Sequence, residues 1–351
     1  MLRSSIIFLL ICSSAFAGEE KSTPVQIPVL MGDGESVQNF GYYANKKESD
    51  RVYQSLPKVW HDQLVRLSGK DENTSAYNWR FLYKALQEAG TLSSKETESG
   101  RLSALNQGNV GSCVGYSSSQ SLDILMATNA YARKQLLQIW RSRVNPDAIY
   151  GITRYDHLGG WDGSTGGWAV EGFKKYGTLH RFVYGSFDLT QPKPENGRSW
   201  AKSGLPKELI KEAIEHQLIS STRLSTTSEA RAALQNGYTI IVCAQASYPN
   251  TRDKDGFSRR NGRAWSHAMA VVGYRGVDTG REGFLILNSW GDTWNDGGVF
   301  PPDMPFGSFW VTPEDLKYHI DQEDSWAFAG YNGFIRQELD WEQVFNFDGR
   351  L

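Results

Sequence analysis

The order of two residue patterns limits the fold of this chain most strongly: one long helical pattern precedes several short strand patterns. From Cys113 onward, Leu122, Leu125 and Met126 recur at helical spacing, which predicts a long helix with a break near Asn129. Later stretches are rich in Val, Ile, Phe and Trp and are separated by turn residues: YTIIVCAQA, HAMAVVGYRG, GFLILNSWG and SFWVT. These are typical of antiparallel strands. We therefore expect an α+β fold with two lobes and a cleft between them.

Composition sets limits on the partners. The 351 residues are 40% hydrophobic and 13% aromatic, which is enough for one large core or two medium ones in a globular protein. Basic and acidic side chains number 37 and 39, for a net charge of −2. This balance gives no electrostatic reason to expect nucleic acid or an anionic membrane surface as a partner.

The first 17 residues have the pattern of a signal peptide. A basic residue, Arg3, precedes an apolar stretch from Ile6 to Cys12, and small residues flank a cleavage site after Ala17. The apolar stretch is too short to span a bilayer. Ile11, directly before Cys12, argues against a lipoprotein cysteine. We therefore expect a protein that is secreted or periplasmic, with no membrane attachment after signal cleavage.

Residues 18–98 are more polar and less patterned, and we expect an N-terminal extension or a propeptide there. An apolar stripe predicts a helix from Tyr77 to Glu88, closed by Gly90. Ser93 to Gly100 has the composition of a solvated linker. The character of the chain changes from Leu102 onward. We expect the main domain to span residues 99–335, followed by a C-terminal tail at 336–351.

Signal cleavage leaves two cysteines, which an exported chain would ordinarily pair. Cys243 lies in the apolar run TIIVCAQA, however, which predicts a buried strand and a small core side chain. Cys113 then remains a free thiol, and nucleophilic catalysis explains why an exported protein would keep one.

Three short contexts supply the parts of a thiol catalyst. Cys113 opens a predicted helix, where the helix dipole and a histidine partner both lower the pKa of a thiol. His267 begins the apolar run in SHAMAVVGY, so we expect it at a strand end facing the cleft. Asn288 follows FLIL at the end of another strand, where its side chain can accept a hydrogen bond from the histidine and orient the ring.

Two further residues complete this set. Gln107 stands six residues before Cys113, and its side-chain NH2 together with the Cys113 backbone N–H would stabilise an oxyanion. Trp290, two residues after Asn288, would cover the bond between asparagine and histidine; a plain core tryptophan fits the same position.

The chain resembles the papain-like cysteine proteases over about residues 102–335, through QGNVGSCVGYS, GSTGGWAVEGFKKYG, SHAMAVVGY and LNSWGDTWNDGG. The resemblance implies a helical lobe, an antiparallel β-barrel-like lobe and an active site in the cleft between them. It also implies a monomeric endopeptidase that cleaves a peptide or protein substrate. Neither a metal nor an organic cofactor is expected.

The second motif looks like the family segment that binds an extended peptide. On that resemblance, Gly166 and Gly167 offer backbone groups to the substrate, and Ser266 and Trp290 are further substrate-binding residues. The family usually has a disulfide between the positions that are Val110 and Ser164 here. Because both cysteines are missing together, we expect packing to hold the helical lobe instead.

Two other functions remain as alternatives. A peptide- or glycan-binding protein on a papain-like scaffold would use the 12 Trp and 16 Tyr residues as its surface, but it would have no need for the complete set of Gln, Cys, His and Asn. A cell-wall amidase of another thiol-hydrolase type would share the cysteine and histidine. It would not explain NSWG after an orienting asparagine.

Overall fold

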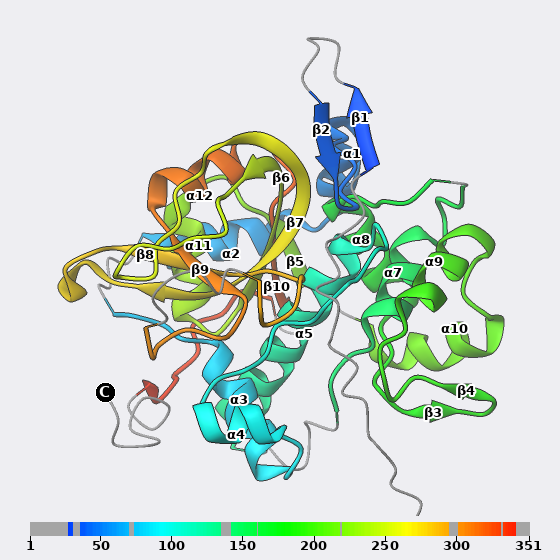
Figure 1. Ribbon diagram of the computed structural model, residues 1–351, viewed down its shortest axis with the longest axis horizontal. Coiled ribbons are helices and arrows are strands. Elements are labelled where there is room, and N and C mark those ends of the chain that lie inside the picture. The colour runs from blue at the N-terminus through cyan, green and yellow to red at the C-terminus, as the bar shows by residue number, and fades with distance from the viewer. Residues whose placement is uncertain are drawn as a thin grey trace, which may run out of the picture.

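The helix α5 (Cys113–Ala132) runs between two groups of elements in the computed structural model (Figure 1). The structure describes residues 27–30, 36–69, 74–134, 142–159, 161–217, 220–294, 301–330 and 333–341. Helices gather on one side of α5 and a mostly antiparallel sheet lies on the other, which confirms the predicted α+β class. Among the described residues, no helix has both the length and the apolar character needed to cross a membrane.

The helical lobe is built around α5, which is buried along most of its length. Three of its serine side chains donate to backbone carbonyls, as where Ser121 Oγ donates to Ile240 O at 2.9 Å, whereas the buried Ser118 Oγ has no hydrogen-bond partner. The break predicted near Asn129 is wrong, because the helix continues to Ala132. The other elements of this lobe are α7 (Pro146–Arg154), α8 (Gly166–Tyr176), β3 (Val183–Tyr184), β4 (Phe187–Asp188), α9 (Pro194–Ser203), α10 (Lys207–Ala213) and the 3-10 helix η1 (Ile214–His216).

The second lobe contains the sheet, with the strand order β1-β2-β7-β6-β10-β5, and β8 pairs with both β7 and β9. The prediction of a barrel-like lobe needs correction, because the described strands do not close. Two strands share one edge of β7. The first half of β7 pairs with β2 and the second half pairs with β8, so the sheet branches there. The elements are β5 (Ser220–Arg223), α11 (Thr227–Gln235), β6 (Thr239–Ser247), β7 (Gly262–Arg275), the 3-10 helix η2 (Val277–Thr279), β8 (Gly283–Leu287), β9 (Ser308–Val311), α12 (Pro313–Ile320) and β10 (Trp326–Gly330).

The region before α5 contains β1 (Ile27–Leu30), β2 (Ser36–Asn39), α1 (Lys46–Ser55), α2 (Lys58–Ser68), α3 (Trp79–Glu88) and α4 (Ser94–Ser99). The predicted helix at 77–88 is confirmed as α3. The predicted linker at 93–100 is wrong. Ser93 and Glu96 form a capping box that starts α4, and Gly100 ends it at φ 67°. The signal peptide predicted for residues 1–17 lies outside the described residues.

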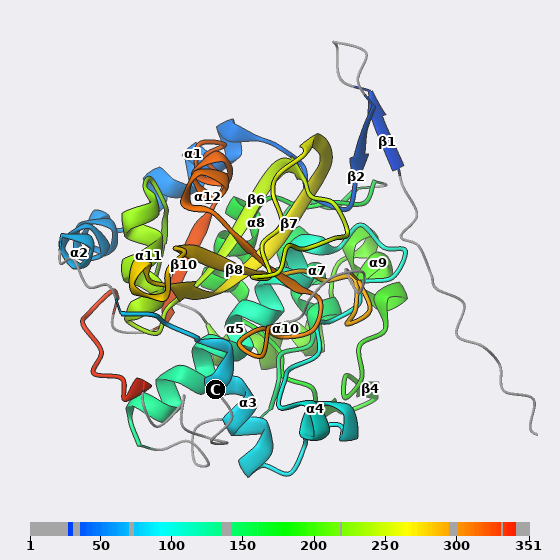
Figure 2. The ribbon, with the colours of Figure 1, turned by 60° about the vertical axis from the view of Figure 1, so that its left-hand side comes forward.

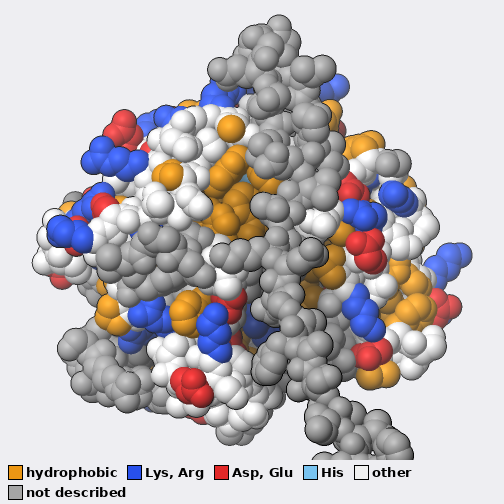
Figure 3. Space-filling view, viewed as in Figure 1, with side chains coloured by type: hydrophobic (Ala, Val, Ile, Leu, Met, Phe, Trp, Pro, Cys, Tyr) orange, Lys and Arg blue, Asp and Glu red, His pale blue; other side chains and the backbone are white. Residues whose placement is uncertain are grey.

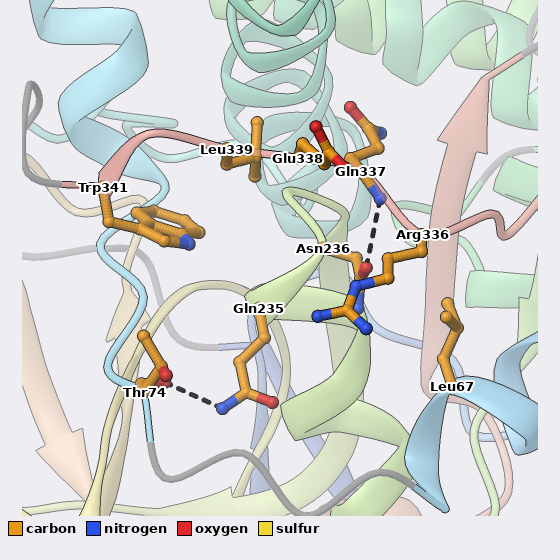
Figure 4. Close-up of a pocket in the computed structure, with 9 residues that line it drawn as sticks. All are labelled: Leu67, Thr74, Gln235, Asn236, Arg336, Gln337, Glu338, Leu339 and Trp341. Atoms are coloured by element: carbon orange, nitrogen blue, oxygen red, sulfur yellow. Dashed lines mark hydrogen bonds between the residues drawn. The ribbon is translucent and has the colours of Figure 1, made fainter.

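Residues 333–341 cross the molecule from α2 toward α3, a path seen in Figure 2 near the label C. Phe334 N donates to Gln63 Oε1 of α2 at 2.9 Å, and Tyr238 Oη donates to Ile335 O at 2.6 Å. The same segment lines a pocket of about 330 Å³ with the end of α11 (Figure 4). None of the residues that line this pocket belongs to the site predicted from the sequence.

Candidate active site

Cys113 is the first residue of α5, where the positive end of the helix dipole lies. Its side chain is fully buried, and the backbone N–H of Ala268 donates to Sγ at 3.3 Å. Burial raises the pKa of the thiol to about 12, against smaller opposite effects from backbone donors. In this covered arrangement the thiol is protonated at neutral pH.

His267 lies on β7 beside Ala268, so one strand carries both the imidazole and the donor to the thiol. Because β7 begins at Gly262, His267 lies inside the strand and not at its end as predicted. Its Nε2 is 2.7 Å from Asn288 Oδ1. That oxygen also accepts the N–H of Ser289 at 2.8 Å, so it is an acceptor, and Nε2 of the neutral ring carries the hydrogen.

The other ring nitrogen of His267 is the chemically available one. Nδ1 is buried and makes no hydrogen bond. Burial lowers the pKa of His267 to about 4, although the bond to Asn288 acts in the opposite direction. The covered site therefore holds a neutral imidazole whose Nδ1 can accept a proton.

Asn288 directly follows β8 and is bonded to α5 through Gln120, a residue that no sequence motif indicated. Gln120 Nε2 donates to Asn288 O at 3.2 Å, and Gln120 Oε1 accepts the N–H of Leu105 at 2.9 Å. The only sequence signal for Gln120 is its position two helical turns after Cys113. Through this side chain, the helix that carries the cysteine also fixes the asparagine.

Trp290 lies against the histidine ring, as predicted. The two ring centroids are 4.6 Å apart with an angle of 23° between the planes, and Trp290 itself is only 9% exposed. This stacking keeps water from the bond between His267 and Asn288 on that side.

Gln107 is buried, and all of its polar atoms have partners. Its Nε2 donates to Phe40 O at 2.8 Å and to Val110 O at 3.0 Å, while its Oε1 accepts from Ser289 Oγ at 2.7 Å. One donor of the predicted oxyanion site is therefore bound to a carbonyl of the N-terminal region.

Residues 40–43, which we call the cover segment, are bonded to both lobes beside Cys113. On the sheet side, Phe40 N donates to Ser266 O at 3.0 Å, and Ser266 Oγ donates to Tyr42 O at 2.7 Å. On the helical side, Ser164 N donates to the carbonyl of residue 41 and Ser164 O accepts from the N–H of residue 43, both at 2.8 Å. The cover segment thus pairs with Ser164 and Ser266 in an extended form.

The side chain of Phe40 enters an aromatic cluster around His267. Its ring centroid lies 4.6 Å from that of Trp290, 5.5 Å from that of His267 and 6.1 Å from that of Trp265. On the face of the molecule drawn in Figure 3, hydrophobic side chains gather near the centre, over β6 and β7. The edge of the Phe40 ring therefore lies against the His267 imidazole, with an angle of 68° between the two planes.

Gly41 lies directly against Gly111 in the loop before Cys113. Its φ is 114°, and a Cβ on this residue would overlap the backbone carbonyl group of Gly111. The next residue, Tyr42, is buried, and burial together with the charge of Asp324 raises the pKa of its hydroxyl well above the ordinary value. The cover segment therefore fits this surface closely.

The predicted peptide-binding glycines have partners inside the protein. The N–H groups of Gly166 and Gly167 donate to the two carboxylate oxygens of Asp324 at 2.8 and 2.9 Å. The extended cover segment pairs with Ser164 instead. Asp324 could not be identified from the sequence, because it lies in a plain context, QEDSW, far along the chain. Burial raises the pKa of Asp324 to about 6 although its three N–H donors favour the ionised form.

Cys243 lies on β6 and is buried, as predicted, and both described cysteines are free thiols. Across the described ranges, no group of three or more His, Cys, Asp or Glu side chains is arranged to hold a metal ion.

Comparisons with known proteins identify a family. A family model described as "Papain family cysteine protease" matches residues 95–302. No match was found among curated proteins.

Solved structures with a similar fold include several cysteine proteases. Xylellain from Xylella fastidiosa is 17% identical, with a TM-score of 0.48, and the match covers 89% of this chain and 98% of that one. Digestive procathepsin L 3 of Tenebrio molitor is 14% identical, with a TM-score of 0.41, over 82% of this chain and 94% of that one. The structure of the cysteine protease and lectin-like domains of Cwp84 from Clostridium difficile is 18% identical, with a TM-score of 0.43. The match covers 67% of this chain and 50% of that one.

Proposed function

Because the chain belongs to the papain family of cysteine proteases, we propose that it hydrolyses peptide bonds through an acyl-enzyme on Cys113. The cover segment blocks this site until it is displaced. One observation carries the proposal: His267 Nε2 lies 2.7 Å from Asn288 Oδ1, and the next residue on the same strand, Ala268, donates its N–H to the Cys113 thiol. It fixes the tautomer in which Nδ1 can take the thiol proton.

The reaction uses the groups in a fixed order. The proton of Cys113 passes to His267 Nδ1 and Sγ attacks the carbonyl carbon of the peptide bond. The C–N bond then breaks, and the amine leaves with the proton from Nδ1. Water attacks the thioester and gives a proton to Nδ1, and the return of this proton to sulfur releases the acid and the free thiol.

Gln107 has a double role in this scheme. In the covered state its NH2 group holds Phe40 O at 2.8 Å, and after displacement the same donor would face the carbonyl oxygen of the substrate. The Phe40 carbonyl therefore occupies a donor that the reaction needs. Displacement would also hydrate the thiol and the imidazole, which removes the main cause of the raised pKa of Cys113 and the lowered pKa of His267.

We place the working enzyme outside the cytoplasm, secreted or periplasmic, as a monomer that acts on peptide or protein substrates. The support is the signal-peptide pattern of residues 1–17. N-terminal sequencing of the active form would test both the cleavage after Ala17 and any later processing.

The decisive experiment measures cleavage of fluorescent casein by the wild type, Cys113→Ala and Cys243→Ala. Each protein is assayed before and after limited proteolysis has removed the N-terminal residues, the cover segment included. We expect activity in the processed wild type and Cys243→Ala, and none in Cys113→Ala. Full activity of Cys113→Ala would contradict the proposal.

The complete burial of Cys113 favours one second candidate, a peptide- or glycan-binding protein without catalysis. A peptidyl epoxide separates the two functions, because it reacts only with an activated thiol. No labelling of Cys113 in the processed protein would favour the binding protein.

A further inference from the structure

The backbone around Ser164 is the part of the helical lobe that pairs with an extended chain. The Ser164 N–H and C=O groups bind the carbonyl of Gly41 and the N–H of Tyr43, both at 2.8 Å. A peptide that replaced the cover segment would meet the same two groups. Their orientation therefore decides whether such a peptide can bind in extended form.

The peptide unit that supplies the Ser164 N–H also contains the Gly163 carbonyl. Gly163 has φ 130°, a conformation open to glycine, so its own backbone does not fix the plane of this unit. The chain also has Val110 and Ser164 where the family resemblance implies a disulfide. Other groups must hold the unit in place.

Two side chains from one turn of α7 hold Gly163 from both sides. Arg154 Nη1 donates to Gly163 O at 2.6 Å, and Gly163 N donates to Tyr150 Oη at 2.7 Å. Tyr150 and Arg154 are four residues apart and therefore share one face of the helix. A cationic donor on the Gly163 carbonyl also polarises the same peptide unit, which strengthens the Ser164 N–H as a donor.

The free-energy cost of burying the Arg154 guanidinium is greater than its single hydrogen bond to Gly163 offsets. The residue is 0% exposed, and its Nε and Nη2 have no hydrogen-bond partners. Its guanidinium carbon lies 4.1 Å from the ring centroid of Trp161. Burial lowers the pKa of Arg154, and Tyr150 and, to a smaller extent, Asp162 oppose this effect. Such an arrangement favours a role in orienting the loop over a role in stability alone.

We propose that Arg154 is a positioning residue for substrate: it holds the Gly163 carbonyl so that Ser164 can pair with an extended peptide. Tyr150 assists from the same helix face. This inference rests on the proposed function, because it assigns the substrate the place that the cover segment now fills.

The test uses the full chain and two reagents that modify Cys113. Iodoacetamide needs only an accessible thiol, whereas an epoxysuccinyl dipeptide also needs pairing at Ser164. Both reagents must wait for the cover segment to leave, so the ratio of their rate constants cancels that step. For Arg154→Met we expect the ratio of epoxide to iodoacetamide rates to fall about tenfold, which corresponds to one hydrogen bond to a charged group.

The matched variants separate positioning from folding. Arg154→Lys can still donate to the Gly163 carbonyl, so its ratio should stay within about threefold of the wild type. Tyr150→Phe should give an intermediate loss, and Arg259→Met, a change at an exposed arginine, should give none. If Arg154→Met does not fold, Arg154→Gln, which keeps a neutral donor, and Arg154→Lys provide the graded series.

Two outcomes overturn the inference in different ways. A folded Arg154→Met with a wild-type ratio removes the positioning role and leaves the peptidase proposal intact. A wild type whose Cys113 reacts with iodoacetamide but never with the epoxide removes both the peptidase and the substrate role of Arg154.

Discussion

Two parts of the N-terminal region are attached to the rest of the molecule in different ways. Residues 39–55, which contain the cover segment and α1, lie on the surface of both lobes. Residues 76–99, which contain α3 and α4, are built into the sheet lobe. Both parts belong to the stretch that composition alone treats as one polar extension. The difference lies in what each part buries, and it teaches where a removable segment can end.

The later part shares a core with the sheet. Phe81 is fully buried and its ring lies 4.9 Å from Tyr131 and 5.2 Å from Trp341. Ala76 exchanges backbone hydrogen bonds with Tyr274 of β7. Asn78 Nδ2 donates to Leu234 O of α11 and to Tyr238 O directly before β6. Removal of these residues would open the hydrophobic core.

The earlier part adds only a few side chains to a core, Tyr42 and Val52 in the cluster that contains Cys113, and is otherwise held by backbone bonds and surface charges. Arg51 of α1 pairs with Glu171 of α8 at 2.7 Å, and Arg223 of β5 pairs with Asp50 at 2.7 Å. Arg51 is 46% exposed and Glu171 is 31% exposed, so solvent screens this pair strongly. A segment held in this way can leave while the core remains. If a propeptide is removed, we expect its end to lie before residue 76.

The largest effect should come from Phe81→Ala. Deleting a fully buried phenylalanine costs about 3–5 kcal/mol of unfolding free energy, because the cavity lies in the shared core. Urea denaturation measures the loss. Phe40→Ala provides the matched control. Its loss of unfolding free energy cannot exceed the free energy that holds the cover segment in place, because a displaced segment no longer uses the contacts of Phe40. Equal large losses in both variants would erase the distinction between the two parts.

Asp324→Asn should change how stability depends on pH. The pKa of Asp324 is raised from 3.8 to about 6 in the folded protein. The folded state therefore holds the proton more tightly, and the stability linked to this group is lost as the pH rises from about 4 to about 6. The loss is on the order of 3 kcal/mol.

Burial lowers the pKa of His267 to about 4 and that of His319 to about 3, so both give the opposite slope across this window, and the informative quantity is the difference in unfolding free energy between wild type and variant. Wild-type minus Asp324→Asn unfolding free energy should fall between pH 4 and pH 6 in urea titrations. A rise would mean that the N–H donors of Gly166, Gly167 and Trp326 outweigh burial.

Phe40→Ala should expose the thiol in the folded protein. Loss of the ring contacts with Trp290 and His267 weakens the covered state, and we expect iodoacetamide to modify Cys113 about tenfold or more faster. Mass spectrometry of the modified peptide identifies the site, and Cys243, buried on β6, serves as the internal control. An unchanged rate would show that Phe40 does not limit access.

The smallest effects should come from the two helix caps. Ser93→Ala removes the capping box of α4 and should cost about 1 kcal/mol of unfolding free energy. Asn45 Oδ1 accepts the N–H of Glu48 at the start of α1, so Asn45→Ala should instead speed the modification of Cys113 by a few fold. If Asn45→Ala lowers the free energy of unfolding but leaves the rate of Cys113 modification unchanged, α1 unfolds together with the core and not with the cover segment.

Local contexts were enough to predict the elements that carry the candidate catalytic residues. Helical spacing after Cys113, the apolar run after His267 and the strand before Asn288 are all short-range patterns, and the structure has α5, β7 and β8 there. The helix α3 was predictable for the same reason, since its apolar stripe faces a core.

Long-range pairings were not predictable in this way. Asp324 binds the N–H groups of residues more than 150 positions earlier, and Phe40 reaches His267 from the opposite end of the chain. Nothing in their neighbours indicates these partners. The mistaken linker at 93–100 has another cause: a polar composition suits a solvated loop, but serine followed three residues later by glutamate also starts a helix.

Gly41 gives the cover segment a consequence for genetics. A φ of 114° and the overlap of any Cβ with the Gly111 carbonyl group leave no room for another amino acid. Under the proposed function, nearly every missense allele at codon 41 should release activity without any processing step. A library at codon 41 should therefore give many clearing colonies on casein plates. A library at codon 90 should give few, because Gly90 also has a positive φ but faces open space.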